Sequence, residues 1–207
     1  MHLYRIVFDK SSLLARQHYW RPHRFHGVLM AAFEGASHGF SDKGRVLFRM
    51  EQSDTGQIYA LIQCASPFSD ETAFAPYGNY QIEAKTIDTF LKLVAAEKRD
   101  FRFRMAVNPV KTVQTNDGNG RRRIPLTNED DVLIWLSRHG INSGFELRYA
   151  AIKRSHKVPG KTETEIVNVV TIEGLLSTTN PQKMGEAILK GIGKAKIFGC
   201  GLISLAA

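Results

Sequence analysis

The chain has 207 residues, with 28 Lys and Arg against 20 Asp and Glu, which gives a formal net charge of +8 at pH 7. Its 43% hydrophobic and 23% charged residues are typical of a globular protein with one ordinary domain or two small ones, which excludes a disordered or fibrous chain. No apolar run approaches the ~18 residues that a membrane-spanning helix needs. The first residues are too often polar for a signal peptide. We therefore expect a soluble, cytoplasmic protein with no membrane partner.

The cysteine content indicates a reducing compartment. Cys64 and Cys200 lie in apolar stretches and lack CxxC spacing, so two buried free thiols are expected rather than a disulfide framework. No cluster supplies four Cys or His ligands at the spacing of a structural zinc site. We therefore expect no bound metal.

The positive charge is concentrated in one part of the chain. Residues 101–125 hold six bases and one acid, whereas residues 51–100 hold four bases and eight acids. A localised basic surface favours a polyanionic partner. A solvated basic face without a ligand remains the alternative.

The first half of the chain has the hydrophobic patterns of strands, one helix and a hairpin. Pro22 can occupy the first turn of a helix, and Phe25, Leu29 and Phe33 follow it at near-helical spacing. The predicted elements are a strand at 3–8, a helix from Pro22, a loop at 35–44, a hairpin of strands 45–50 and 57–64, a strand near 80–82 and a short helix from Asp88.

The second half begins with a clear period-two pattern. In residues 101–107 the arginines fall on one face and the apolar side chains on the other, which predicts a half-exposed strand. The remaining predicted elements are a hairpin tip at 115–120, a helix from Thr127 to Gly140, strands 145–150 and 165–172 around a basic loop, a helix at 181–189 and a strand at 199–205.

Together these elements give the order βαββαβ twice. That order predicts an α+β fold of two tandem ferredoxin-like (RRM-like) domains, each with an antiparallel sheet and two helices on one face. We place the domains at residues 1–97 and 98–207. The second helix of the first domain is the least defined element.

Residues 190–202 are rich in glycine and lysine but match no nucleotide-binding motif. A phosphate loop needs Ser or Thr after its Gly-Lys pair, where this chain has Ala195, and a glycine where it has Ile188. Lys196 occupies the third glycine position of the dinucleotide fingerprint. We therefore expect no nucleotide cofactor. Glycines and lysines allow a close approach to phosphate, but they fit a tight helix-to-strand connection equally well.

Four stretches in this order and spacing resemble one family over essentially the whole chain. They are residues 103–111 (FRMAVNPVK), 132–136 (VLIWL), 172–175 (IEGL) and 191–205 (GIGKAKIFGCGLISL). The last is similar to the glycine-rich loop of CRISPR-associated RNA-binding proteins of the RAMP superfamily. All four together resemble the repeat-RNA endonuclease of the type I-E Cascade complex, the CasE family.

The resemblance implies metal-independent cleavage of the hairpin in CRISPR precursor RNA. It further implies that the mature guide RNA stays bound and that other Cascade subunits are partners. No cofactor is implied. A catalytically silent RNA-binding subunit of a CRISPR ribonucleoprotein remains the alternative function.

The resemblance also implies a catalytic histidine. His26 matches the catalytic residue of the family, whereas His23 replaces a tyrosine found in many members and Ala31 replaces a lysine found in some. Positions 23 and 26 share one face near a helix start, which suggests the hypothesis of an acid–base pair of two histidines. Tyr19 is a rival for the missing tyrosine.

The candidate RNA-binding residues fall into three groups: bases beside His26, bases on the predicted second-domain strands and hairpins, and the glycine-rich loop. They are Arg21, Arg24, Arg102, Arg104, Lys111, Arg121, Arg122, Arg123, Lys153, Arg154, Lys157, Gly191, Gly193, Lys194, Lys196, Gly199 and Gly201. Because an A-form stem has a major groove too narrow for easy reading, we expect them to contact backbone and loop ends.

Overall fold

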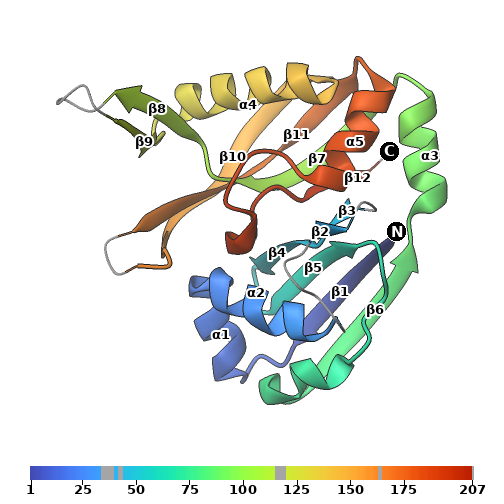
Figure 1. Ribbon diagram of the computed structural model, residues 1–207, viewed down its shortest axis with the longest axis vertical. Coiled ribbons are helices and arrows are strands. Elements are labelled where there is room, and N and C mark those ends of the chain that lie inside the picture. The colour runs from blue at the N-terminus through green and yellow to red at the C-terminus, as the bar shows by residue number, and fades with distance from the viewer. Residues whose placement is uncertain (34–39, 42–43, 115–119, 163–164, 207) are drawn as a thin grey trace.

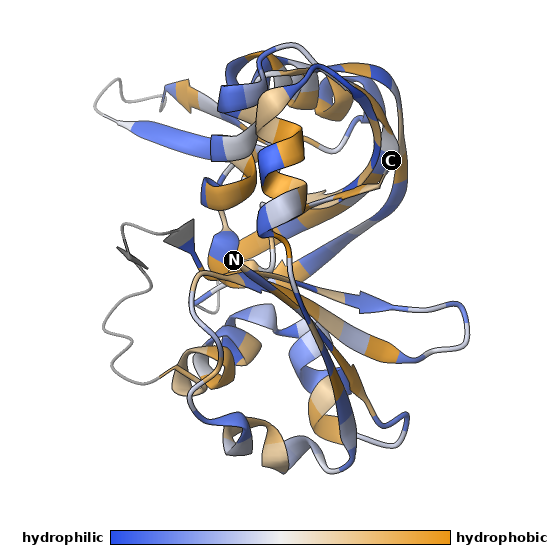
Figure 2. Ribbon diagram, turned by 90° about the vertical axis from the view of Figure 1, so that its right-hand side faces the viewer, coloured by the Kyte–Doolittle hydropathy of each residue, from blue (hydrophilic) through white to orange (hydrophobic). Residues whose placement is uncertain are grey.

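Two four-stranded antiparallel sheets organise the computed structural model, which describes residues 1–33, 40–41, 44–114, 120–162 and 165–206. In Figure 1 the blue and blue-green strands and helices of the first half lie below the second half, whereas the green helix at residues 88–96 lies beside the second half. Figure 2 shows the two halves one above the other, with apolar segments in the strands and helices of each. No helix of the described residues is long and apolar enough to cross a membrane.

The first sheet has the strand order β4-β5-β1-β6, and all its pairings are antiparallel. A short pair, β2 (Phe40–Ser41) with β3 (Gly44–Arg45), precedes β4. The other elements of this half are β1 (His2–Phe8), α1 (Leu13–Trp20), α2 (Pro22–Ala31), β4 (Leu47–Gln52), β5 (Ile58–Cys64), the 3-10 helix η1 (Glu71–Tyr77), β6 (Tyr80–Thr86) and α3 (Asp88–Ala96).

The second sheet repeats the arrangement with the order β10-β11-β7-β12. A separate two-stranded ribbon, β8 with β9, follows β7. The elements of this half are β7 (Asp100–Val107), β8 (Val110–Gln114), β9 (Arg121–Pro125), α4 (Glu129–Ser143), β10 (Phe145–Pro159), β11 (Ile166–Thr178), α5 (Pro181–Lys190), the 3-10 helix η2 (Lys196–Phe198) and β12 (Ile203–Ala206).

In each sheet the order corresponds to the second, third, first and fourth strand of a βαββαβ unit, so the predicted α+β fold of two tandem ferredoxin-like domains is confirmed. The boundary between residues 97 and 98 stays a prediction. The helix α3 before it contributes Val94 to the buried core of the second half. This helix therefore connects the first sheet to the helical layer of the second.

Each half has its own hydrophobic core between sheet and helices. In the first, Phe25 and Leu29 of α2 are fully buried, and the Phe25 ring lies 5.3 Å from that of Phe48 on β4. In the second, Leu136 of α4 packs with Phe103 and Met105 of β7 in one cluster. The alternation of β7 thus places its apolar side chains in the core, as predicted.

The ends of the helix predicted from Thr127 to Gly140 differ in the structure, where α4 runs from Glu129 to Ser143. The helix α4 begins after Asn128, whose side chain accepts a hydrogen bond from the Asp131 amide. It continues past Gly140 to Ser143 and ends at Gly144, whose φ of 81° is left-handed. A Cβ at Gly140 would lie 2.8 Å from the Phe145 ring, so this glycine serves close packing inside the helix.

Three further elements correct the sequence prediction. The helix α1 was not predicted, because the residues it buries include a histidine and a tyrosine instead of a clear apolar stripe. The short 3-10 helix η1 takes the place of the second helix of the first unit. Residues 153–157 belong to the long strand β10 rather than to a basic loop. Most of the predicted hairpin tip at 115–120 lies outside the described residues.

A buried arginine joins the two halves. Arg49 of β4 is 2% exposed, and its Nε donates to Glu51 Oε1 over 2.7 Å. Its Nη1 donates to the carbonyl oxygens of Arg104 (3.0 Å) and Leu202 (3.1 Å), and its Nη2 donates to Ser204 Oγ over 3.1 Å. Because these acceptors belong to the second half, one guanidinium fixes the non-core face of the first sheet against the strands β7 and β12.

We predict that Arg49→Ala destabilises the protein by about 3–5 kcal/mol, because it leaves two carbonyl oxygens buried without their donor and removes one of the ion-pair partners of the buried Glu51. The matched control Arg5→Ala removes an exposed pair with Glu83 and is expected to cost less than about 1 kcal/mol. Urea unfolding followed by circular dichroism measures both. Equal effects of the two substitutions would show that Arg49 is not the junction between the halves.

Candidate functional site

The two histidines of α2 form the centre of the candidate site. Pro22 begins the helix, and His23 and His26, one turn apart, lie on the same face of it. Both side chains are partly buried. The His26 ring lies 6.1 Å from that of Phe48, and the His23 ring lies 5.7 Å from that of Phe198. The helix therefore holds both imidazoles close to aromatic side chains of other elements.

The surroundings of both imidazoles disfavour their charged form. Burial lowers the pKa of His26, and the positive charge of Lys161 lowers it further. Burial also lowers the pKa of His23, with a further contribution from Arg24 and a smaller one from Arg21. His23 Nδ1 is buried and has no hydrogen-bond partner among the described residues. At neutral pH both rings are therefore predominantly neutral and able to accept a proton.

The glycine-rich loop (residues 191–201) of the second half lies against this helix. Its turns use left-handed backbone at Gly191, Gly193 and Gly199, and also at Ala195, whose φ is 60°. A Cβ at Gly199 would lie 3.3 Å from the Phe48 ring, so the loop seats closely on β4. The structure thus brings the predicted histidines together with the predicted glycine-rich segment, although the two lie near opposite ends of the sequence.

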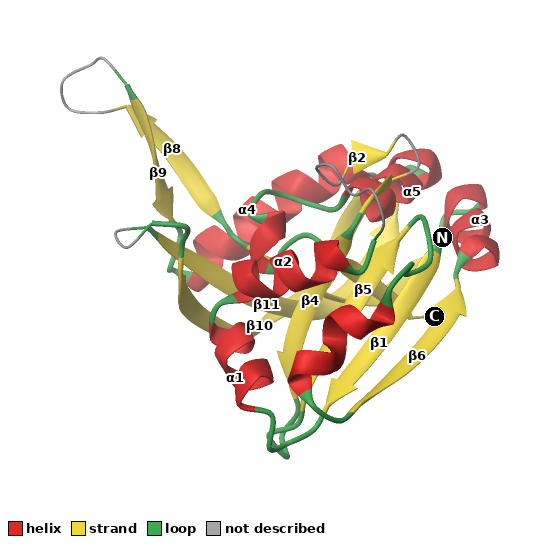
Figure 3. Cartoon of the chain, turned by 60° about the horizontal axis from the view of Figure 1, so that its bottom comes forward, coloured by secondary structure: helices red, strands yellow, loops and turns green. Residues whose placement is uncertain are grey.

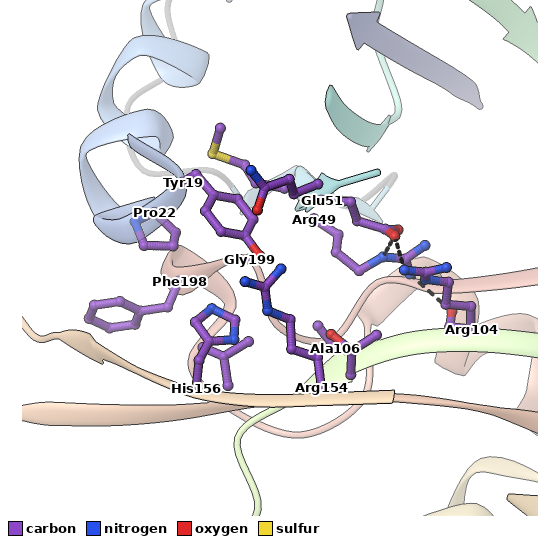
Figure 4. Close-up of a pocket in the computed structure, with 14 residues that line it drawn as sticks. Tyr19, Pro22, Arg49, Glu51, Arg104, Ala106, Arg154, His156, Phe198 and Gly199 are labelled. Atoms are coloured by element: carbon purple, nitrogen blue, oxygen red, sulfur yellow. Dashed lines mark hydrogen bonds and ion pairs between the residues drawn. The ribbon is translucent and has the colours of Figure 1, made fainter. Parts of the chain in front are cut away.

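Tyr19 lies in an aromatic and cationic cluster of its own. It is 4% exposed, and its ring stacks on that of His156 with 5.9 Å between centroids. Arg154 lies 5.2 Å above the Tyr19 ring and 5.8 Å from that of the exposed Trp20. Figure 4 shows Tyr19, Arg154 and His156 directed toward one another across a narrow cavity of about 50 Å³. Since burial raises the Tyr19 pKa, its hydroxyl stays protonated at neutral pH.

The predicted basic residues of the second half are concentrated on a projecting ribbon. Figure 3 shows β8 and β9 extending away from both sheets. Lys111 pairs with Ile124 and Val113 pairs with Arg122, so Lys111 and Arg122 share one face of the ribbon. Arg121 and Arg123 occupy the other face. All four side chains are exposed. The ribbon therefore presents positive charge on both of its faces.

The remaining predicted binding residues have different environments. Arg104 forms ion pairs with Glu51 and, at 2.6 Å, with Glu173, so its guanidinium is engaged between the two halves. Lys153 lies 3.7 Å from Glu173 as well. Lys153 is exposed, as are Arg21, Arg24, Arg102, Lys157 and Lys194, whereas Lys196 is partly buried and donates to the Gly193 carbonyl.

Sequence reasoning missed Lys161 and His156. Lys161 belongs to the connection between β10 and β11, and its charge acts on both histidines of α2. His156 supplies the stacking partner of Tyr19. Neither residue has a local sequence signal, because each reaches the site only through the hairpin of two long strands.

No group of three or more His, Cys, Asp or Glu side chains suited to a metal ion occurs within the described ranges. The described part of the chain also contains no phosphate loop, as its glycine-rich loop follows α5 without the Ser or Thr that such a loop requires. The groups that the described site does contain are imidazoles, exposed cations and backbone amides.

Fold and site together define a tandem ferredoxin-like protein with a histidine pair between a basic surface and a glycine-rich loop. A family model described as CRISPR associated protein matches residues 1–207. The chain therefore belongs to the CRISPR-associated protein family.

Individual relatives and structures agree with this assignment. The CRISPR system Cascade subunit CasE of Escherichia coli (strain K12) is 33% identical over 170 residues, which cover 77% of this chain and 80% of that protein. The CRISPR-associated endoribonuclease Cse3 of Thermus thermophilus is 23% identical over the full length of both chains. A structure of Thermus thermophilus Cse3 bound to an RNA representing a pre-cleavage complex has a TM-score of 0.80 at 22% identity and covers 100% of this chain and 98% of that one.

The His156 stack makes a pH-dependent contribution to stability. Burial and the neighbouring Arg154 lower the pKa of His156 to about 4, whereas an unfolded histidine titrates near 6.5. Between these values the unfolded state binds more protons, so stability is present at pH 7 and is lost as the pH falls toward 4.

We predict that the wild type loses about 1–2 kcal/mol more than His156→Phe between pH 7.5 and pH 5, after allowance for solvent screening. The phenylalanine keeps a ring against Tyr19 but cannot titrate. Urea unfolding of both proteins at the two pH values measures the difference. Parallel losses in the two proteins would contradict a buried, neutral His156.

Proposed function

We propose that this chain is an endoribonuclease that binds the repeat hairpin of CRISPR precursor RNA and cleaves it without a metal ion. The observation that carries the proposal is the position of His23 and His26 on one face of α2, next to the glycine-rich loop and the basic strands. Membership of the CRISPR-associated protein family and the likeness to CasE and Cse3 support the substrate.

The chemistry uses the 2′-hydroxyl of the RNA itself. Its oxygen attacks the adjacent phosphorus in line, the bond to the 5′ oxygen breaks, and the products carry a 2′,3′-cyclic phosphate and a 5′-hydroxyl. One base has to remove the 2′ proton, and one acid has to protonate the departing 5′ oxygen. The proton balance is therefore met by two groups of the protein, with no further reactant.

His26 and His23 are proposed for these two proton transfers. In the free protein both imidazoles have a lowered pKa and are therefore ready to accept a proton. A bound phosphate brings negative charge, which raises the pKa of the nearer imidazole and favours its protonated form. Lys161 is available to offset charge on the phosphoryl oxygens. We propose Tyr19 as a positioning residue, because its ring stacks on that of His156 and so holds the strand β10 against the helix α1.

The exposed bases are proposed to hold the RNA backbone. The ribbon of β8 and β9 and the end of β10 and β11 project on the same side of the molecule in Figures 1 and 3. Arg121, Arg122 and Arg123 on the ribbon and Lys157 on β10 are exposed there. Phosphate contacts of this kind fix the register of a stem without reading its sequence.

We further propose that the mature guide RNA remains bound and that the protein joins other Cascade subunits, as the name of the Escherichia coli relative indicates for that protein. A cytoplasmic location is proposed as well, and the two free, buried cysteines support a reducing compartment. The alternative of a silent RNA-binding subunit is favoured by one observation: His23 and Ala31 occupy the positions at which the resemblance implies a tyrosine in many members and a lysine in some.

We predict that His26→Ala slows cleavage of a cognate repeat hairpin about 10²–10⁴-fold in EDTA, because one proton transfer loses its catalyst. Binding of an uncleavable hairpin with a deoxy sugar at the cut position should change little. Single-turnover cleavage and filter binding measure the two quantities, and His2→Ala on β1 is the matched histidine control.

One outcome would contradict the enzyme assignment, and another would contradict its mechanism. Retention of the RNA without cleavage by the wild type would favour the silent subunit. Cleavage of the deoxy hairpin at the wild-type rate would exclude attack by the 2′-hydroxyl.

We predict that changing Arg121, Arg122 and Arg123 to Gln flattens the dependence of RNA affinity on salt, because each arginine that binds a phosphate releases a counterion. The slope of log K against log salt should become shallower by about one for each arginine that binds a phosphate in the wild type, and therefore by about three at most.

The matched control changes Lys85, Lys92 and Lys98 to Gln, which removes the same charge from exposed positions elsewhere. Filter binding at several salt concentrations measures both slopes. If the two triple variants behave alike, net charge rather than the ribbon determines affinity.

A further inference from the structure

A cavity of about 410 Å³ opens between the glycine-rich loop, the base of the β8–β9 ribbon and the start of β11. It is separate from the narrow cavity beside Tyr19, although Phe198 lines both. Its volume falls in the range of small-ligand sites, about 300–1,000 Å³. A single nucleotide is a ligand of suitable size.

The cavity combines two kinds of lining. Four cationic side chains, those of Arg45, Arg123, Lys194 and Lys196, line part of it. An apolar wall is formed by side chains that include Val110, Val167 and Phe198, of which Val167 and Phe198 also belong to a buried cluster. A phosphate alone needs the cations but not the wall. A nucleotide uses both, because its base has an apolar face and its phosphate a charge.

Asn108 adds an unused hydrogen-bonding group to the lining. Its Oδ1 is buried and has no hydrogen-bond partner among the described residues. An unpaired buried acceptor is unfavourable, and a donor brought by a ligand relieves that penalty. The amide of an asparagine both donates and accepts, which matches the edge of a nucleobase. Glu165 provides a second acceptor in the same lining.

The cavity adjoins the histidine pair. Phe198 in its wall is the residue whose ring lies 5.7 Å from that of His23. Glu165 is close enough for its charge to act on His23. A nucleotide in the cavity therefore lies next to a phosphodiester bond held at the two histidines.

We propose that this cavity binds one unpaired nucleotide of the RNA beside the cleaved bond, with Asn108 on the edge of its base and the cations around its phosphate. The inference rests on the proposed function and adds to it a determinant of the cleavage site. Contacts to the backbone alone carry no sequence information, whereas one captured nucleotide specifies which bond reaches the histidines.

The test is a double-mutant cycle between the protein and the RNA. Uncleavable hairpins with a deoxy sugar at the cut position carry one abasic residue at each unpaired position near the cut. We expect one abasic position to weaken wild-type binding roughly tenfold. Asn108→Leu, which keeps the branched shape of the side chain but removes its hydrogen-bonding groups, should weaken binding of the intact hairpin by a similar factor and should leave binding of the hairpin abasic at that position unchanged.

A second variant tests the proposal without changing a buried residue, in case Asn108→Leu does not fold. Lys194 is exposed, so Lys194→Gln should leave unfolding by urea unchanged while it lowers the salt slope of RNA binding by about one. Lys92→Gln on α3 is the control and should leave the slope as it is.

The proposal is overturned if no abasic position weakens binding by the wild type. It is also overturned if the abasic residue at the sensitive position weakens binding by the wild type and by Asn108→Leu by the same factor. It is also overturned if Lys194→Gln and Lys92→Gln have equal slopes. Failure of the proposed function is a distinct result, because it appears as intact wild-type hairpin that is never cleaved. Coupling between Asn108 and one nucleotide in the absence of cleavage would support a nucleotide site on a silent binding subunit.

Discussion

The buried guanidinium of Arg49 is the constraint on which the site depends. A charge that is 2% exposed is stable only with its donors satisfied, and here one partner is Glu51 while three acceptors belong to β7, β12 and the residue before it. The histidines lie in the first half of the chain and the glycine-rich loop in the second. Their relative position therefore follows from a polar junction that has one favourable geometry, whereas an apolar contact would allow several.

The glycine-rich loop of the second half packs against the first half and forms part of the candidate site. Its left-handed residues at 191, 193, 195 and 199 turn the chain so tightly that the loop returns to β7, where the Gly201 amide donates to the Ala106 carbonyl over 2.8 Å. The same turns direct Phe198 toward His23 and seat Gly199 on Phe48. The loop thus packs against both halves of the chain, and it also forms one wall of the candidate active site and one wall of the proposed nucleotide cavity.

Much of this fold follows from local sequence patterns, and its departures have tertiary causes. The alternation of residues 101–107 is local, and it appears in the structure as predicted. The helix predicted from Thr127 is also present, and it begins at Glu129 after the cap residue Asn128. The length of β10 depends on tertiary structure, because β10 pairs with β11 well beyond the apolar part of its own sequence. The helix α1 also depends on tertiary structure, because it buries His18 against Tyr77. For the same reason Lys161 and His156 escaped prediction. The sequence around Arg49 likewise does not predict that its guanidinium bonds to acceptors in the other half of the chain.

The charges of the protein and the protonation of its histidines are linked through the RNA. Burial is the main cause of the lowered pKa of His23 and His26, and nearby cations of the kind that attract a polyanion, such as Lys161, lower it further. When phosphates neutralise those cations and one phosphate lies beside the pair, the contribution of the cations is removed, while the effect of burial remains. In the proposed mechanism, a bound substrate therefore favours the protonated form of one of the two imidazoles. This coupling requires partly buried rings, because water would screen the same charges around an exposed histidine.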